Sequence, residues 1–190
     1  MRKLILKMSL SIDGFVGGPN GELDWIFETY DADATAWTMD TLRDTGVHIM
    51  GSRTFRDMAS YWPSSTEVFA APMNDIPKVV FSRKGSLKGL TTSPKTESWN
   101  NARVASGDLA EEIARLEREP GKNSLAHGGG SFAQSLVQSG LVDEYRLLIH
   151  PVALGSGLPL FSKAPKPIPL KLLSSTRFPA GSIANVYEPR

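Results

Sequence analysis

The chain has 190 residues, of which 41% are apolar and 22% charged, and its 21 basic and 20 acidic side chains give a formal net charge of +1. This length and composition predict one domain over residues 1–190 and exclude an intrinsically disordered chain, and the balanced charge argues against a nucleic-acid partner. The sequence has no cysteine, which excludes disulfides, thiolate metal sites and cysteine nucleophiles.

The N-terminal segment starts basic and turns apolar, but Lys7 ends the apolar run well short of a signal-peptide core. The longest uncharged stretch, residues 123–142, is rich in Ser, Gln and Gly, so we do not expect it to span a membrane. The sequence therefore predicts a cytoplasmic protein with no membrane partner.

The first half of the chain alternates strands with helices. Residues 4–10 form a nearly continuous apolar run, which is typical of a central strand covered on both faces. A loop rich in glycine follows. Asp31 and Gly46 are start and stop signals for the first helix. The elements expected after the loop are a helix over 31–44, a strand over 47–50, a helix from 51 to about 63 and a strand over 76–82.

The second half ends in strands only. We expect a weak strand over 102–105, an amphipathic helix over 108–118, a short strand over 124–126, a helix over 131–138 and strands over 145–149, 170–178 and 183–188. Residues 179–182 have hairpin-turn composition. The early alternation predicts an α/β fold with helices on both faces of a mainly parallel sheet, and the closing strands make that sheet mixed.

Three consecutive glycines, Gly128, Gly129 and Gly130, lie between a predicted strand and a predicted helix that opens with Ser131. Glycines let the backbone turn tightly and approach a ligand closely. The helix start presents unpaired N–H groups and a positive dipole end, which suit a phosphate or pyrophosphate. The alternative is a tight turn that binds nothing.

Other catalytic patterns lack essential parts. His127 and the glycines after it resemble the oxyanion-hole loop of lipase-type hydrolases, but the chain has no Gly-x-Ser-x-Gly nucleophile elbow. It also has no Gly-x-x-x-x-Gly-Lys-Ser/Thr loop, and residues 155–157 lack the third glycine of a dinucleotide fingerprint. Its three histidines do not follow a metal-ligand spacing, so we expect no metal.

A second candidate phosphate site also joins a strand to a helix start. Gly51 allows close approach, and Ser52, Arg53 and Thr54 bring hydroxyls and a guanidinium that suit phosphate. The alternative is simple capping of the helix by Ser52.

A third candidate follows the strand that ends near residue 82. Ser82, Arg83 and Lys84 place a hydroxyl and two cations together, which suits a phosphomonoester such as the 2′-phosphate of NADPH. The alternative is an exposed basic turn. All three candidates lie at strand ends, where open α/β sheets bind ligands.

Four segments, in this order, resemble the dihydrofolate reductase superfamily, and most closely its branch related to the reductase domain of bacterial riboflavin biosynthesis. They are Met8–Phe15, Met50–Phe55, Gly128–Phe132 and Ile149–Gly157. The resemblance implies a dihydrofolate reductase-like three-layer fold, a homodimer, and NADPH bound across the strand ends. It assigns the pyrophosphate to residues 128–131, further phosphate contacts to 51–54, the 2′-phosphate to 82–84, and the nicotinamide side to the first loop (residues 11–20).

Dihydrofolate reductases proper carry an acidic residue in the helix before the Gly-Ser-Arg-Thr-Phe-like segment. Asp33 reaches that place only with a small gap in the alignment, and Asp13 is a second candidate for a catalytic polar group. An ordinary turn aspartate is the alternative for Asp13.

The resulting prediction is an NADPH-dependent reductase that transfers a hydride to a small pterin- or pyrimidinone-like heterocycle, with the cofactor supplying the hydride chemistry. The alternatives are a nucleotide-binding protein without turnover and a dihydrofolate reductase proper. Trp25, Trp37 and Trp62 are more typical of packing than of substrate walls, and His48 and His150 of satisfied core histidines.

Overall fold

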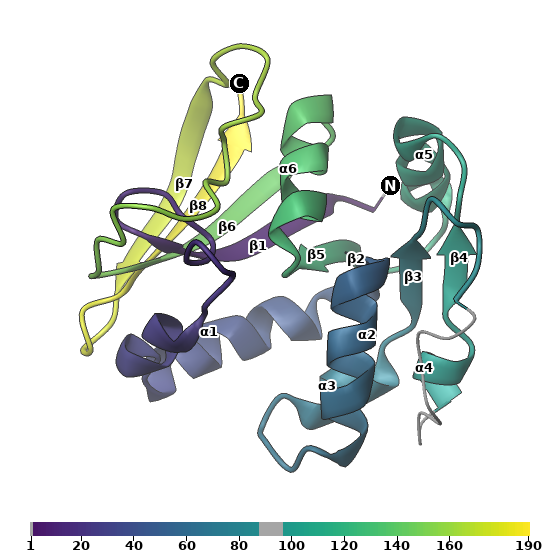
Figure 1. The fold of residues 1–190 in the computed structure, drawn as a ribbon, viewed down its shortest axis with the longest axis horizontal. Helices are drawn as coiled ribbons and strands as arrows, with labels where there is room; N and C mark the ends of the chain where they lie inside the picture. The colour runs from purple at the N-terminus through teal and green to yellow at the C-terminus, as the bar shows by residue number, and fades with distance from the viewer. Residues whose placement is uncertain (1, 88–96) are drawn as a thin grey trace.

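A computed structural model describes residues 2–87 and 97–190 and contains one eight-stranded sheet with the order β4-β3-β2-β5-β1-β6-β8-β7 (Figure 1). The strands are β1 (Leu4–Ser11), β2 (Thr45–Gly51), β3 (Lys78–Phe81), β4 (Arg103–Ala105), β5 (Asn123–His127), β6 (Glu144–His150), β7 (Leu170–Arg177) and β8 (Ile183–Pro189). Neighbours from β4 to β6 pair in parallel, and β8 is antiparallel to both β6 and β7. The predicted mixed, mostly parallel sheet is confirmed.

Helices cover both faces of this sheet. They are α1 (Ala32–Arg43), α2 (Ser52–Tyr61), α3 (Ala70–Asp75), α4 (Glu97–Asn100), α5 (Leu109–Arg118) and α6 (Gly130–Ser139), with short 3-10 helices η1 (Asp24–Thr29) and η2 (Trp62–Ser64). Side chains of β1 point alternately to the two faces. Leu4 and Leu6 pack in the cluster that contains α5 and α6, whereas Ile5 packs with Leu42 of α1. The fold therefore has the three predicted layers.

Local sequence signals account for the longer helices. Asp31 accepts a hydrogen bond from the N–H of Ala34 at the start of α1, and Asp108 accepts one from the N–H of Ala110 at the start of α5. Each cap satisfies a helix N–H that otherwise lacks a partner. Both helices begin and end within one residue of the predicted bounds.

Two short helices, α3 and α4, were not predicted because tertiary contacts hold them. Asn74 of α3 donates to the carbonyl of Trp62 and accepts from the indole N–H of Trp99 in α4. Trp99 is fully buried against α2. Strand β2 also starts earlier than predicted, at Thr45, where its pairing with β5 contains an irregularity.

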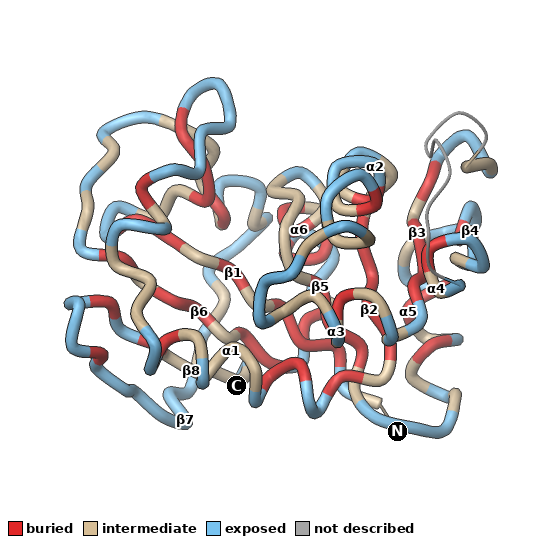
Figure 2. The backbone as a smooth tube through the Cα atoms, turned by 90° about the horizontal axis from the view of Figure 1, so that it is seen from below, coloured by how far each residue is buried: buried red, intermediate tan, exposed pale blue. Residues whose placement is uncertain are grey.

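Burial is greatest in the centre of the sheet. Figure 2 shows long buried stretches along β1, β5 and β2, while β7, at the edge, is exposed along almost its whole length. Because β1 to β6 are parallel, their carboxyl ends lie at one edge of the sheet, here called the carboxyl edge. In the described ranges, no helix has the length and apolar character needed to cross a membrane.

Candidate functional site

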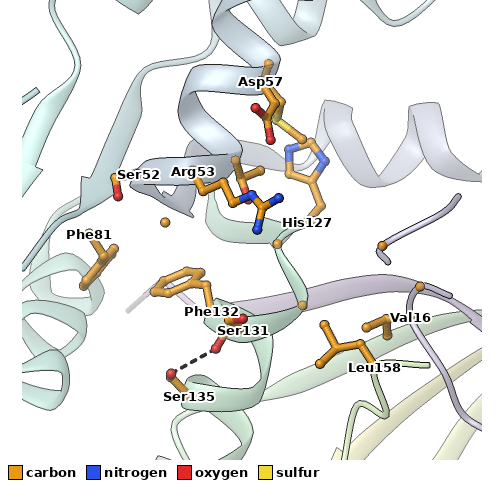
Figure 3. A pocket seen from close by; sticks show the side chains of 18 of the residues that line it. Val16, Ser52, Arg53, Asp57, Phe81, His127, Ser131, Phe132, Ser135 and Leu158 are labelled. Atoms are coloured by element: carbon orange, nitrogen blue, oxygen red, sulfur yellow. Dashed lines mark hydrogen bonds between the residues drawn. The ribbon is translucent and has the colours of Figure 1, made fainter. Parts of the chain in front are cut away.

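A cavity of about 1280 Å³ lies at the carboxyl edge. Its walls come from the ends of β1 to β5, the N-terminal turns of α2 and α6, and the first loop (Figure 3). Of the residues predicted to bind cofactor, every one except Lys84 lines this cavity. The structure thus brings three segments that are far apart in the sequence to one site.

The glycine loop, Gly128–Gly130, forms the middle of the cavity wall. Gly128 and Gly129 have φ of +89° and +76°, which other residues rarely adopt. A Cβ at Gly129 would overlap the hydroxyl of Thr54, and one at Gly130 would overlap Leu158. Helix α6 starts directly after this turn, and none of the described side chains caps it. Its first N–H groups are therefore placed to meet a ligand.

Helix α2 begins at the same cavity. Gly51 is its N-cap residue and no side chain of the described residues caps the helix, so the alternative reading, capping by Ser52, is not found. Arg53 extends from the first turn toward the glycine loop (Figure 3). Two helix N-termini, each carrying a partial positive charge, thus meet at one place, and such an arrangement favours an anionic group.

The β3 end of the cavity consists of Phe81, Ser82 and Arg83. Ser82 is buried and its N–H donates to the carbonyl of Ala105 at 3.0 Å, whereas Arg83 is exposed. The rings of Phe81 and Phe132 lie 5.0 Å apart and form an apolar wall (Figure 3). This end therefore offers an aromatic surface beside an exposed cation, while Lys84 lies outside the lining.

The β1 end of the cavity consists of Lys7 and Ser9 on β1 and His127 on β5. Burial lowers the pKa of Lys7 to about 8, and its ammonium lies 5.6 Å from the centre of the Tyr30 ring. Burial, with the charges of Lys7 and Lys78, lowers the pKa of His127 to about 3. The sequence prediction missed Lys7 as a site residue, although a lysine within an otherwise apolar central strand was a signal.

The first loop forms the wall beside this end. Its backbone is tied to residues 158–160: the N–H of Val16 donates to the carbonyl of Leu158 at 2.8 Å, and the N–H of Leu158 donates to Gly17 at 2.9 Å. Gly157 packs so closely on the Gly17 carbonyl that a Cβ would overlap it. The loop is therefore held by a segment more than half the chain away.

Asp13 anchors this loop and does not line the cavity. Its carboxylate accepts hydrogen bonds from the Ser11 hydroxyl at 2.5 Å and from the N–H groups of Gly155 at 2.7 Å and Leu154 at 3.2 Å. The bond from Ser11 and then the bond from Gly155 hold the pKa of Asp13 below its ordinary value. An exposed carboxylate held ionised in this way is a poor proton donor, so the geometry favours the turn role over the catalytic one.

Asp33 also lies outside the lining. It is exposed in the first turn of α1, whose capping carboxylate is that of Asp31. The placement of Asp33 therefore gives no support to the expectation that it acts on a substrate. Among the described residues, no three His, Asp or Glu side chains are grouped as metal ligands would be.

Of the tryptophans, Trp62 lines the cavity, whereas Trp25 is buried beside His150 and Trp37 packs near Phe178. His48 is buried with both ring nitrogens paired, as predicted. His150 differs from the prediction in part, because its Nδ1 pairs with the Thr29 hydroxyl but its buried Nε2 has no partner among the residues that the structure describes.

The charge of the cavity is positive. Its described lining contains four cationic side chains, Lys7, Arg53, Arg83 and Lys163, and one carboxylate, Asp57. Together with the two helix N-termini, these charges favour a ligand with several anionic groups.

Comparisons with known proteins agree with the fold. A family model described as the RibD C-terminal domain matches residues 2–184. The uncharacterized protein YyaP of Bacillus subtilis (strain 168) is 33% identical over 186 residues, which are 98% of this chain and 94% of that protein.

Solved structures extend this agreement at lower identity. A putative riboflavin biosynthesis protein from Shewanella sp. PV-4 superposes with a TM-score of 0.74 at 22% identity, over 99% of both chains. Dihydrofolate reductase from Enterococcus faecalis, complexed with NADP(H), superposes with a TM-score of 0.61 at 12% identity, over 99% of this chain and 96% of that one. These likenesses confirm the predicted dihydrofolate reductase-like fold.

Proposed function

The chain belongs to the family of RibD C-terminal domains, and on that premise we propose that it is an NADPH-dependent reductase of a small pterin- or pyrimidinone-like heterocycle. The observation that carries the proposal is the meeting of two uncapped helix N-termini and a glycine loop at one positively charged cavity. A similarly folded protein, the Enterococcus faecalis dihydrofolate reductase, is complexed with NADP(H), which supports the choice of cofactor.

The residues present fit a phosphorylated dinucleotide along the whole cavity. The amides of Gly128 to Ser131 would hold the pyrophosphate, with Ser52, Arg53 and Thr54 opposite them. Arg83 at the β3 end would bind the 2′-phosphate, with the Phe81 and Phe132 rings near the adenine. The strand order β3-β2-β5-β1 then leaves the β1 end for the nicotinamide and the substrate.

When bound, the reduced nicotinamide supplies the hydride. The chain's own residues bind the dinucleotide and the substrate and orient them for the transfer. Val16 and Leu158 bring apolar side chains to the wall beside the glycine loop (Figure 3), where they exclude water from the reacting groups. Because Asp13 and Asp33 lie outside the lining, the proposal takes the proton from water or from a group at the β1 end.

Titration with NADPH and NADH tests the cofactor. We expect NADPH to bind at least about tenfold more tightly, since a 2′-phosphate gains a charge-assisted contact with Arg83. Arg83→Ala should remove most of that preference while NADH affinity stays nearly constant, and Arg177→Ala, an exposed arginine on edge strand β7, should leave it unchanged. Equal binding of both dinucleotides by the unaltered protein would overturn the assignment of the 2′-phosphate.

Turnover is tested by NADPH absorbance with a panel of pterins, pyrimidinones and quinones. Oxidation of NADPH with any of them supports the reductase. The placement of Asp13 and Asp33 outside the lining favours, as a second candidate, a nucleotide-binding protein without turnover, which predicts tight NADPH binding and no oxidation with the whole panel. Strong inhibition by antifolates would favour a dihydrofolate reductase proper.

The proposal also includes a homodimer that acts in the cytoplasm, as the resemblance and the sequence composition imply. Light scattering at several concentrations tests the first of these. A constant mass of one chain would contradict the dimer.

A further inference from the structure

A chain of hydrogen bonds sets the protonation of the His127 ring. The Nε2 of His48 lies 3.3 Å from the carbonyl oxygen of Pro72, and the Nδ1 of His48 lies 3.0 Å from the Nε2 of His127. A carbonyl oxygen only accepts, so His48 Nε2 donates. A neutral His48 then accepts at Nδ1, and His127 must donate from Nε2.

The remaining nitrogen of His127 is consequently an acceptor. Burial and the neighbouring charges of Lys7 and Lys78 keep the ring neutral, so Nδ1 carries a lone pair. None of the described residues forms a hydrogen bond with Nδ1, and this atom is not among the fully buried polar atoms that lack a partner. Because His127 lines the cavity, its free acceptor is available to a ligand.

Lys7 supplies a donor beside this acceptor. The two residues are register partners on the parallel strands β1 and β5, and both line the cavity. No carboxylate of the described residues forms an ion pair with Lys7, and the ring face of Tyr30 satisfies none of its three N–H groups in the manner of an oxygen acceptor. Paired positions of the two strands thus bring an ammonium and an available lone pair to the same part of the cavity wall.

We propose that Lys7 Nζ and His127 Nδ1 together bind an amide edge, that is a carbonyl oxygen and an N–H group next to it, at the β1 end of the cavity. The ammonium donates to the carbonyl oxygen, and the imidazole accepts from the N–H. His48 acts as a positioning residue, because its bond to His127 fixes which nitrogen accepts. This inference rests on the proposed function for the ligands that reach this end.

Two ligands bring such an edge to the β1 end. One is the carboxamide of the nicotinamide, and the other is the lactam of a pterin- or pyrimidinone-like substrate. The chemistry is the same in both, so matched pairs of probes separate them. NADPH is paired with its reduced 3-acetylpyridine analogue, which keeps the carbonyl but lacks the N–H. Lumazine is paired with 1,3-dimethyllumazine, whose ring N–H groups are replaced by methyl groups.

Binding of these four probes is measured by fluorescence titration of the unaltered protein and of three variants. His127→Leu should lower the preference for the N–H-bearing member of at least one pair by about tenfold or more. Lys7→Met should weaken both members of that same pair to a similar extent, since both keep the carbonyl. Lys171→Met, on the exposed edge strand β7, is the matched control and should change neither pair.

The pattern identifies the ligand. A response confined to the dinucleotide pair assigns the amide edge to the nicotinamide carboxamide, and a response confined to the lumazine pair assigns it to the substrate. An unchanged preference in both pairs, lack of lumazine binding included, overturns the proposal. Failure of the unaltered protein to bind NADPH would instead refute the proposed function, while the lumazine pair, titrated without dinucleotide, still tests the amide edge.

A measurement on the unaltered protein guards against variants that fail to fold. Nitrogen NMR of histidine-labelled protein distinguishes protonated from unprotonated ring nitrogens. We expect His127 to show an unprotonated Nδ1 and a protonated Nε2, and His48→Leu to abolish this fixed assignment. Protonation at Nδ1 in the unaltered protein would overturn the proposal.

Discussion

Replacement of Gly129 by alanine tests whether the tight turn of the glycine loop and its close approach to Thr54 require glycine at this position. Alanine at a left-handed φ costs about 1–2 kcal/mol. At Gly129 the new Cβ also overlaps the Thr54 hydroxyl, and relief of such an overlap costs a further ~1–3 kcal/mol. Gly129→Ala should therefore lower the free energy of unfolding by about 2–5 kcal/mol.

Gly140 provides a matched control at the other end of the same helix. Its φ is +65°, close to that of Gly129, but a Cβ there meets no atom of the described residues within 4 Å. Gly140→Ala should therefore show only the backbone cost of about 1–2 kcal/mol and leave NADPH binding unchanged. Urea denaturation of both variants measures the difference, provided that the slope m stays constant.

A second substitution separates overlap from backbone strain. In a Thr54→Ala background the clashing hydroxyl is absent, so Gly129→Ala should cost no more than Gly140→Ala does. If Gly129→Ala and Gly140→Ala destabilise equally in the unaltered background, the close approach of the glycine loop to Thr54 is refuted. Persistence of the full Gly129→Ala cost without the hydroxyl would refute it as well.

Three further predictions concern the loop anchor, a buried lysine and the loop contact. The pKa of Asp13 is lowered in the folded protein, so its carboxylate contributes stability above the unfolded pKa of about 3.9, and this contribution is lost on acidification. The urea midpoints of Asp13→Asn and of the unaltered protein should therefore converge as the pH falls below about 4. Burial lowers the pKa of Lys78 to about 7. Between about pH 7 and pH 10 the unfolded chain therefore binds more protons than the folded one, and the free energy of unfolding rises with pH. Lys78→Met should flatten this rise, and an unchanged slope would contradict the burial argument. Gly157→Ala should displace the first loop, because its Cβ would overlap the Gly17 carbonyl. The N–H of Leu158 binds that carbonyl, so hydrogen exchange at Leu158 should accelerate. Unaltered protection of this N–H would count against the contact.

The sequence predicted those features that depend on neighbours along the chain. Helices with a capping aspartate, such as those after Asp31 and Asp108, were placed to within a residue, because the cap and the first turn are local. The common location of three loops was also predictable, since parallel strands bring their carboxyl ends to one edge. The order of the strands in the sheet, with β5 between β2 and β1, was not predictable from the sequence.

The residues that were missed owe their role to that order. Lys7 and His127 become neighbours only because β1 pairs with β5, and no local pattern encodes this pairing. Conversely, Asp13 had the chemistry of a pocket acid, but its carboxylate is used by the N–H groups of Leu154 and Gly155. Sequence proximity to a cavity does not tell which way a side chain points.

The central place of β1 has a consequence for how the molecule is made. Leu4 pairs with Ser124 on β5 and Ile5 pairs with Glu144 on β6, so β1 is synthesised well before either of the strands that pair with it. Until then its apolar run is unpaired, and contacts of such long sequence separation close slowly. Synthesis of the glycine loop and pairing of β1 thus come close together in time, and the cavity becomes competent to bind only when nearly the whole sheet has formed.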